Sequence, residues 1–212
     1  MPLELWLAYV ATSSVVLAIP GPTILLVLSY SIAHGRKATL PVVMGVALGD
    51  SVAITLSLIG LGTLLATSAL WFTIIKWIGG CYLIYLGFTL LRSAGQPMPL
   101  QAQQTLASAP RKLFGNAFIV TALNPKSIVF FIALLPQFIS ADHPVITQLW
   151  ILGITFVVLA TIGATSYALF AASIRRWLAA PRAQKAYGMV GGGLLMGAGV
   201  WALAAKRVIS AT

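Results

Sequence analysis

The chain has 212 residues, of which 59% are hydrophobic and only 8% are charged. Soluble domains carry about 25% charged residues, so this composition excludes the soluble classes and predicts a protein surrounded largely by lipid. The net charge is +10, and the single cysteine, Cys81, excludes an internal disulfide and a CxxC redox or zinc motif.

Apolar runs long enough to cross a bilayer follow one another along the whole chain. A membrane-spanning helix needs roughly 20 predominantly apolar residues. The first run lacks the basic leader and the cleavage site of a secretory signal, so we expect it to be retained. Runs of this kind lie at approximately 4–31, 39–65, 69–91, 114–139, 146–173 and 186–205.

The only long polar stretch, about 93–112, separates the first three runs from the last three. Three spans per half place the halves in opposite orientations, as in inverted-repeat transporters. We therefore expect an all-α membrane protein with six transmembrane helices in two inverted three-helix repeats. It would form a single transporter domain, with halves at about 1–92 and 113–212 joined by a cytoplasmic linker.

The basic residues predict the orientation of these spans. Nine of the thirteen lie in the first, third and fifth connections, which the positive-inside rule makes cytoplasmic. Both termini would then face outward from a bacterial inner membrane, although Lys206 and Arg207 oppose the rule. The charge reflects topology and attraction to anionic headgroups and requires no nucleic acid. The nine residues are Arg36, Lys37, Arg92, Arg111, Lys112, Arg175, Arg176, Arg182 and Lys185.

A proline-containing break interrupts the first span at Pro20-Gly21-Pro22. Neither proline has an amide hydrogen, so the carbonyls of Val16 and Ala18 lose their helical partners. Gly21 would let the backbone leave helical dihedral angles at low cost. Unsatisfied groups are costly in lipid, so we expect the break to face protein or a wet cavity.

The fourth span has a corresponding break at Asn124-Pro125-Lys126. Pro125 frees the carbonyl of Thr121, and Asn124 precedes it as an N-cap residue would. Half-helices that begin at the two breaks would present free amides suited to a carboxylate. The alternative is a pair of simple structural proline kinks.

Asp50 is the only carboxylate deep inside a span. Such a group normally faces a polar interior, so it is a candidate for binding a substrate ammonium or a coupling proton. It could instead be a structural partner of a buried lysine or hydroxyl. The nearby Gly45 and Gly49 form a small-xxx-small pair that lets another helix approach closely.

Other polar groups inside the spans are weaker candidates. Lys126 could neutralise Asp50, meet a substrate carboxylate, or extend along its helix to the interface. Asn116, Asn124 and Ser127 would form a polar stripe on span four. Thr161 and Thr165 do the same on span five, although such hydroxyls often bond to their own helix.

Catalytic and metal-binding patterns are absent from the sequence. His34 and His143 lie in connections expected on opposite sides of the membrane. The chain contains no HExxH, GxSxG or Walker motif, so we expect no enzyme, no metal and no cofactor. A membrane enzyme of another kind, or a subunit of a membrane assembly, stays an alternative to a transporter.

Motifs in three spans resemble those of the LysE/RhtB family of lysine and homoserine–threonine exporters. They are Ile19-Pro20-Gly21-Pro22, the segment from Ile75 to Gly87, and Asn124 to Phe131, followed by Pro136-Gln137-Phe138. The resemblance extends over essentially the whole chain. It implies secondary export of amino acids or related metabolites from the bacterial cytoplasm, driven by an ion gradient.

Six residues of the two breaks belong both to the motifs that carry the resemblance and to the positions with missing helical hydrogen bonds, whereas Asp50 is selected mainly because it is buried in a span. The expected substrate-binding residues are Pro20, Gly21, Pro22, Asp50, Asn124, Pro125 and Lys126, and Asp50 is also the expected proton-coupling residue. The expected partners are a small-molecule substrate, a coupling proton or cation, and the lipid bilayer. The alternative cargo is another small cation or metabolite.

A glycine-rich sixth run, 188–199, would pack closely within the monomer or between protomers of a homo-oligomer.

Overall fold

The computed structural model describes residues 1–19, 21–67, 69–94, 109–140, 142–171, 173–174 and 180–204. Within these residues the chain is helical apart from short turns, and it contains no strand. Several sequence predictions lie outside them, namely Pro20, most of the polar linker, and four basic residues (Arg175, Arg176, Lys206 and Arg207). The helices are α1 (Leu3–Ala18), α2 (Pro22–His34), α3 (Thr39–Thr67), α4 (Ala69–Arg92), α5 (Pro110–Ala122), α6 (Pro125–Ala133), α7 (Val145–Leu169) and α9 (Pro181–Ala204), with 3₁₀ turns η1 (Gly35–Ala38) and η2 (Leu135–Phe138).

These helices match the predicted apolar runs and confirm both breaks. The first run divides into α1 and α2, and the fourth divides into α5, α6 and η2. The helix α2 ends at His34, and the following Gly35 has φ 62° and ψ −151°, a conformation that glycine adopts at little cost because it has no Cβ. The α5–α6 pair is bent by 40° at its break.

The described residues contain several helical stretches that could cross a membrane. Pro22–Gly60, Val145–Leu169 and Pro181–Ala204 each have the required length and hydropathy, and the bent pair Pro110–Ala122 plus Pro125–Ala133 would add a fourth. Large apolar side chains are exposed on the bundle surface, among them Leu40, Ile59, Ile146 and Trp150. A surface of this kind requires lipid around it, so the chain is an all-α membrane protein.

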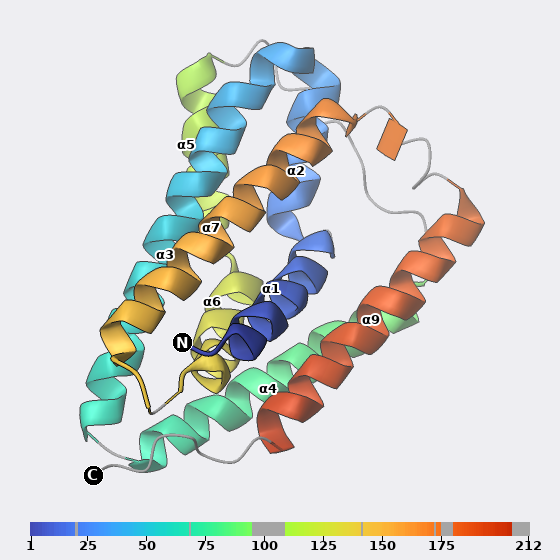
Figure 1. Ribbon diagram of the computed structural model, residues 1–212. Helices are drawn as coiled ribbons and strands as arrows, with labels where there is room; N and C mark the ends of the chain where they lie inside the picture. The colour runs from blue at the N-terminus through green and yellow to red at the C-terminus, as the bar shows by residue number, and fades with distance from the viewer. Residues whose placement is uncertain are drawn as a thin grey trace.

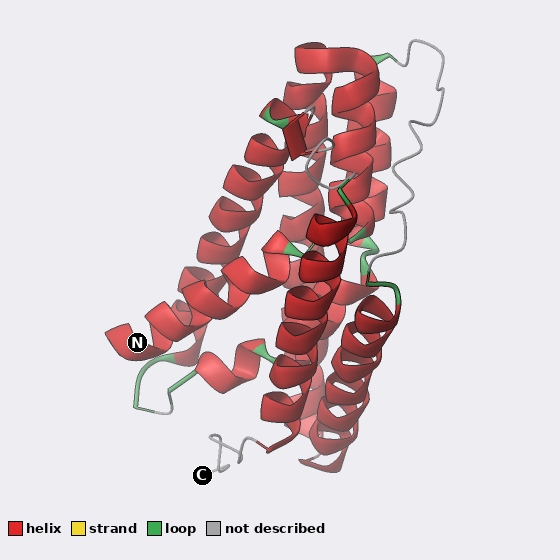
Figure 2. Cartoon of the chain, turned by 90° about the vertical axis from the view of Figure 1, so that its right-hand side faces the viewer, coloured by secondary structure: helices red, strands yellow, loops and turns green. Residues whose placement is uncertain are grey.

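The longest helices pack in pairs. The helix α4 lies along α9 at one edge of the bundle, and α3 contacts both α5 and α7 (Figures 1 and 2). Glycines make the closest approaches, as the sequence predicts. A methyl group placed on Gly45 of α3 would lie 2.5 Å from the carbonyl oxygen of Phe114 in α5, and one on Gly87 of α4 would lie 2.6 Å from that of Gly192 in α9.

The short helix α1 packs by one face against the second half, where it contacts α7, η2 and α9. It contributes Tyr9 and Val16 to the main core. The ring of Tyr9 contacts Phe130 of α6 at 6.2 Å and Phe138 of η2 at 5.2 Å between ring centroids. The packing therefore holds the two broken helices against each other.

Candidate functional site

The first break leaves extended backbone between α1 and α2. Ile19 has φ −78° and ψ 110°, and Gly21 has φ −106° and ψ −167°. The backbone does leave helical dihedral angles at Gly21, as expected, but these angles are open to any residue and do not require glycine. A methyl group on Gly21 would lie 3.4 Å from Nζ of Lys126, which is an ordinary contact.

Side chains from the second half satisfy the carbonyls at the end of α1. Lys126 Nζ donates hydrogen bonds to the carbonyl oxygens of Val16, at 3.0 Å, and Ile19, at 2.8 Å. Tyr167 Oη donates to the carbonyl oxygen of Ala18 at 2.8 Å. Both carbonyls that the prolines were expected to free, those of Val16 and Ala18, thus bind side chains, and that of Val16 also accepts a hydrogen bond of 3.3 Å from the amide of Ile19. The role of Tyr167 was not predicted.

The second break is capped locally, as the Asn-Pro pair predicts. Oδ1 of Asn124 accepts a hydrogen bond of 3.1 Å from the backbone amide of Lys126. The carbonyl of Thr121, which loses its usual partner to Pro125, accepts one of 3.1 Å from the amide of Asn124. A tighter turn therefore replaces the missing helical bond.

Thr23 connects the two breaks. Its Oγ1 accepts hydrogen bonds from Asn124 Nδ2, at 3.1 Å, and from Thr121 Oγ1, at 3.3 Å. Thr23 is the second residue of α2, and Lys126 is the second residue of α6. Thr23 therefore binds residues at the end of α5, the first helix of the second half. Lys126 binds carbonyls at the end of α1, the first helix of the first half. Thr23 follows Pro22 as Lys126 follows Pro125, and this shared position could have identified Thr23 from the sequence.

A small cavity lies between the breaks and collects the predicted site residues. Gly21, Asp50, Asn124 and Lys126 all line it, and its volume is about 20 Å³. Asp50 is 3% exposed, and it accepts no hydrogen bond from the residues that the structure describes. A carboxylate and an ammonium thus face one cavity inside the membrane protein. The remaining lining residues are Leu17, Thr23, Ile24, Val46, Ser127 and Ala160.

Some predicted residues lie away from this cavity. Pro22 and Pro125 are exposed, so they shape the backbone and do not line the cavity. Asn116 is also exposed, and its Nδ2 donates to Tyr30 Oη at 2.7 Å. The expected polar stripe of Asn116, Asn124 and Ser127 is wrong, because the break at 123–124 separates Asn116 from the other two.

Thr161 and Thr165 take the alternative role that the sequence left open for them. Their hydroxyls donate to the carbonyls of Val157 and Thr161, at 2.7 Å each. Lys126 is 9% exposed and extends to the end of α1, so it does not reach along its helix to the interface.

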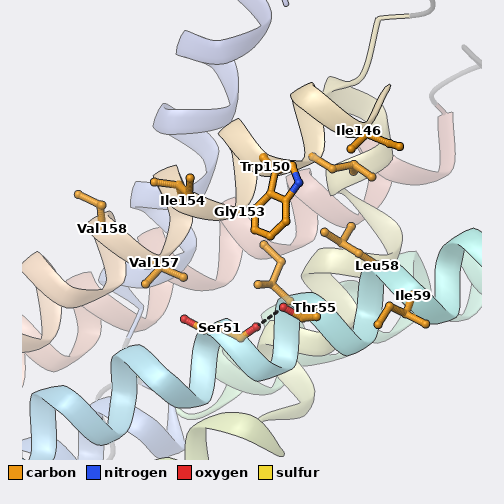
Figure 3. Close-up of a pocket in the computed structure, with 12 residues that line it drawn as sticks. Ser51, Thr55, Leu58, Ile59, Ile146, Trp150, Gly153, Ile154, Val157 and Val158 are labelled. Carbon is orange, nitrogen blue, oxygen red and sulfur yellow. Dashed lines mark hydrogen bonds between the residues drawn. The ribbon is translucent and has the colours of Figure 1, made fainter. Parts of the chain in front are cut away.

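A larger hollow of about 370 Å³ lies between α3 and α7 (Figure 3). Its lining is almost entirely apolar, and Ile146, Trp150 and Ile154 on its rim are exposed. The hydroxyls of Ser51 and Thr55 donate within α3, to the carbonyls of Ala47 and Ser51. The hollow therefore offers no charged group to a zwitterion, and it contains none of the predicted site residues.

The described part of the chain contains no group of three or more His, Cys, Asp or Glu residues that could hold a metal. The chemistry available at the cavity is therefore that of one carboxylate, one ammonium, an amide side chain and hydroxyls. Such a set can bind a small polar or zwitterionic solute by hydrogen bonds and charge.

Comparisons with known proteins agree with this interpretation. The family model described as LysE type translocator matches residues 14–206. A homoserine/homoserine lactone efflux protein of Salmonella typhimurium is 37% identical over 98% of this chain and 100% of its own length, and that of Salmonella typhi has the same values. An uncharacterized membrane protein of Vibrio cholerae is 34% identical over 97% and 100%. No solved structure matches the chain.

Proposed function

Because the chain belongs to the LysE type translocator family, and is therefore a transporter of small molecules and not an enzyme, we propose that it is a secondary active exporter. Its cargo would be amino acids or related metabolites. Its location would be the bacterial inner membrane, and the proton motive force would drive it. The observation that carries the proposal is the cavity between the two breaks, where Asp50 and Lys126 face the same space.

The names of the relatives suggest the first substrates to test, homoserine and its lactone. Homoserine has an α-ammonium and a carboxylate, whereas its lactone retains only the ammonium as a charged group. A site that accepts both must recognise what they share. Asp50, buried and without a hydrogen bond among the described residues, is the group suited to that ammonium.

The packing supports the proposed inverted repeat of two three-helix halves. The helix α3 of the first half contacts α5 and α6, which form the broken helix of the second half. In the same way α7 of the second half contacts α1 and α2. The third helices of the two halves, α4 and α9, pair with each other. A two-fold relation between about 1–92 and 113–212 would produce these pairings, with both termini outside and the linker in the cytoplasm.

The size of the cavity supports alternating access. A space of 20 Å³ holds about one water molecule. An amino acid would therefore enter only after the helices around the cavity separate. We propose that the structure is a closed state between the outward-open and inward-open states.

Transport into vesicles tests this function. Purified protein is reconstituted in liposomes, and uptake of radiolabelled homoserine, homoserine lactone, lysine and threonine is measured with and without a proton gradient. We expect gradient-driven uptake that Asp50→Asn reduces at least tenfold. The matched control is Asp142→Asn, because Asp142 is an exposed carboxylate in the turn before α7.

Each outcome of this assay is informative. Uptake of an unrelated cation or metabolite, with none of the amino acids, would support the alternative cargo. Full gradient-driven uptake by the Asp50→Asn protein would remove Asp50 from the site. An absence of uptake for every solute in the panel would contradict the proposed exporter.

A further inference from the structure

The side chain of Lys126 leaves its own helix and ends on the other broken helix. Lys126 is the second residue of α6, and its Nζ binds the carbonyl oxygens of Val16 and Ile19, which belong to the last turn of α1 and the residue after it. Two of the three N–H groups of the ammonium are thus used. The side chain is 9% exposed, so these bonds are shielded from solvent.

Helix electrostatics favours this position for a positive charge. The N-terminus of α6 carries a partial positive charge, which repels an ammonium, whereas the C-terminus of α1 carries a partial negative charge, which attracts it. Asp50 faces the same cavity from α3 and adds a full negative charge. The ammonium therefore lies where the protein offers two carbonyl dipoles and a nearby carboxylate.

The same oxygen groups are those that bind a small metal cation. In transporters with broken helices, unwound backbone carbonyls and the C-terminal ends of half-helices coordinate Na⁺ or protons. The end of α1 is such a half-helix end, and the carbonyl of Ile19 lies in its unwound segment. Here the position is filled by a side chain of the protein itself.

We propose that Lys126 is a covalently attached occupant of a monovalent-cation site made by the carbonyls of Val16 and Ile19, beside the cavity that the carboxylate of Asp50 also lines. The tethered ammonium makes the wild-type protein independent of Na⁺. Removal of the side chain leaves a site that Na⁺ or a small alkylammonium ion fills. This inference deepens the proposed function, on which it rests, by stating what holds the first break together when no substrate is bound.

The test is cation-dependent stability of a variant that lacks the ammonium. Lys126→Ala and wild type are purified in detergent, and thermal unfolding is measured in NaCl, ethylammonium chloride or choline chloride at equal ionic strength. We expect Na⁺ and ethylammonium, compared with choline, to raise the melting temperature of Lys126→Ala by about 3–6 °C. Wild type should show no difference.

Two further variants make the readout specific. Lys112→Ala removes an exposed lysine of α5 and should behave as wild type. Lys126→Ala combined with Asp50→Asn should lose the response to Na⁺, because none of the described residues then brings a negative charge to the cavity beside the two carbonyls. If Lys126→Ala does not stay folded in choline, recovery of monodisperse protein after extraction in NaCl or ethylammonium chloride provides the same comparison.

An equal melting temperature of Lys126→Ala in all three salts would overturn the proposal. So would a Na⁺ response of the same size in Lys112→Ala, or no recovery of folded Lys126→Ala in any of the salts. These measurements use no transport. The exporter function can therefore fail while the cation site stands, and the reverse also holds.

Discussion

The two breaks have the same arrangement of backbone, but different hydrogen-bond partners stabilise them. Each second half-helix begins with a proline at its first position, after Gly21 in one case and Asn124 in the other. At the second break, the carbonyls of Ile119 and Thr121 bind the amides of Leu123 and Asn124, so nearby backbone satisfies them. At the first break, the amide of Ile19 also binds the carbonyl of Val16, but side chains of distant residues bind the carbonyls of Val16, Ala18 and Ile19 as well.

This difference indicates which break responds to movement of the halves. The backbone hydrogen bonds of the second break persist when the halves move, because both partners belong to it, and in the described part of the chain only its bonds to Thr23 cross between the halves. The first break loses the bonds from Lys126 and Tyr167 if α6 or α7 moves away from α1. We therefore expect separation of the halves to remove charge-assisted hydrogen bonds from the first break but not from the second.

The largest effect should come from removing the ammonium at the first break. Lys126→Met keeps an unbranched side chain but removes the ammonium that binds the carbonyls of Val16 and Ile19, and among the described residues only that of Val16 keeps a backbone donor. Loss of two charge-assisted hydrogen bonds in a buried place should lower the free energy of unfolding by about 3–5 kcal/mol. Thermal unfolding in detergent measures this.

The control for that variant is Lys112→Met, whose lysine is exposed at the start of α5. It should melt within about 1–2 °C of wild type, because substitutions at exposed positions change stability little. Equal melting temperatures for the two variants would show that the first break does not depend on Lys126.

Asn124→Ala should have the next largest effect, because it removes hydrogen bonds from the second break. The variant loses the cap on the amide of Lys126 and the bond to Thr23. Loss of an N-cap costs about 1–2 kcal/mol. Asn124→Asp retains an acceptor for the cap and should recover part of that stability. A variant with alanine that is as stable as wild type would contradict the local capping of the second break.

Tyr167→Phe separates the two side chains that hold the first break. It removes only the hydrogen bond to the carbonyl of Ala18. The expected loss is about 1 kcal/mol, measured as a lower melting temperature. Tyr85→Phe is the control, since Tyr85 of α4 is 60% exposed. If both phenylalanine variants lose the same stability, the bond from Tyr167 contributes nothing specific.

Gly21→Ala should give the smallest effect, and in the direction of stability. Its extended dihedral angles suit alanine, which lowers the entropy of the unfolded chain by about 0.4–1 kcal/mol at a compatible site. The added methyl group only touches Lys126. A loss above about 2 kcal/mol would show that the ammonium needs the space beside Gly21. Gly163→Ala, with nothing near the added methyl group, is the control.

The residues that are unusual in an apolar chain, namely prolines within spans and buried charges, could be identified from the sequence. The prolines and Asn124 identified both breaks, because a missing amide hydrogen has a local consequence that can be read without a structure. Asp50 and Lys126 were found because a charge within a span is expensive. The structure places both beside the same cavity.

The partners of the first break could not be predicted, because they depend on long-range packing. Tyr167 lies 149 positions from the carbonyl it binds, and a tyrosine in an apolar run gives no local signal. Thr23 is similarly ordinary in sequence, and it acquires a role only because α2 packs beside α5. The polar stripe failed for the same reason, since helical spacing does not continue through a bend of 40°.

The glycine contact between α4 and α9 also determines which parts of the molecule can move. Gly87, Gly192 and Gly199 bring the two backbones so close that a single methyl group would collide with a main-chain oxygen of the neighbouring helix, and one on Gly80 would collide with the side chain of Leu203. A pair packed this tightly should keep a constant spacing while other helices rearrange. Spin labels on the outer faces of α4 and α9 would therefore supply a fixed reference distance, against which displacements of α1, α3 or α7 during transport could be calibrated.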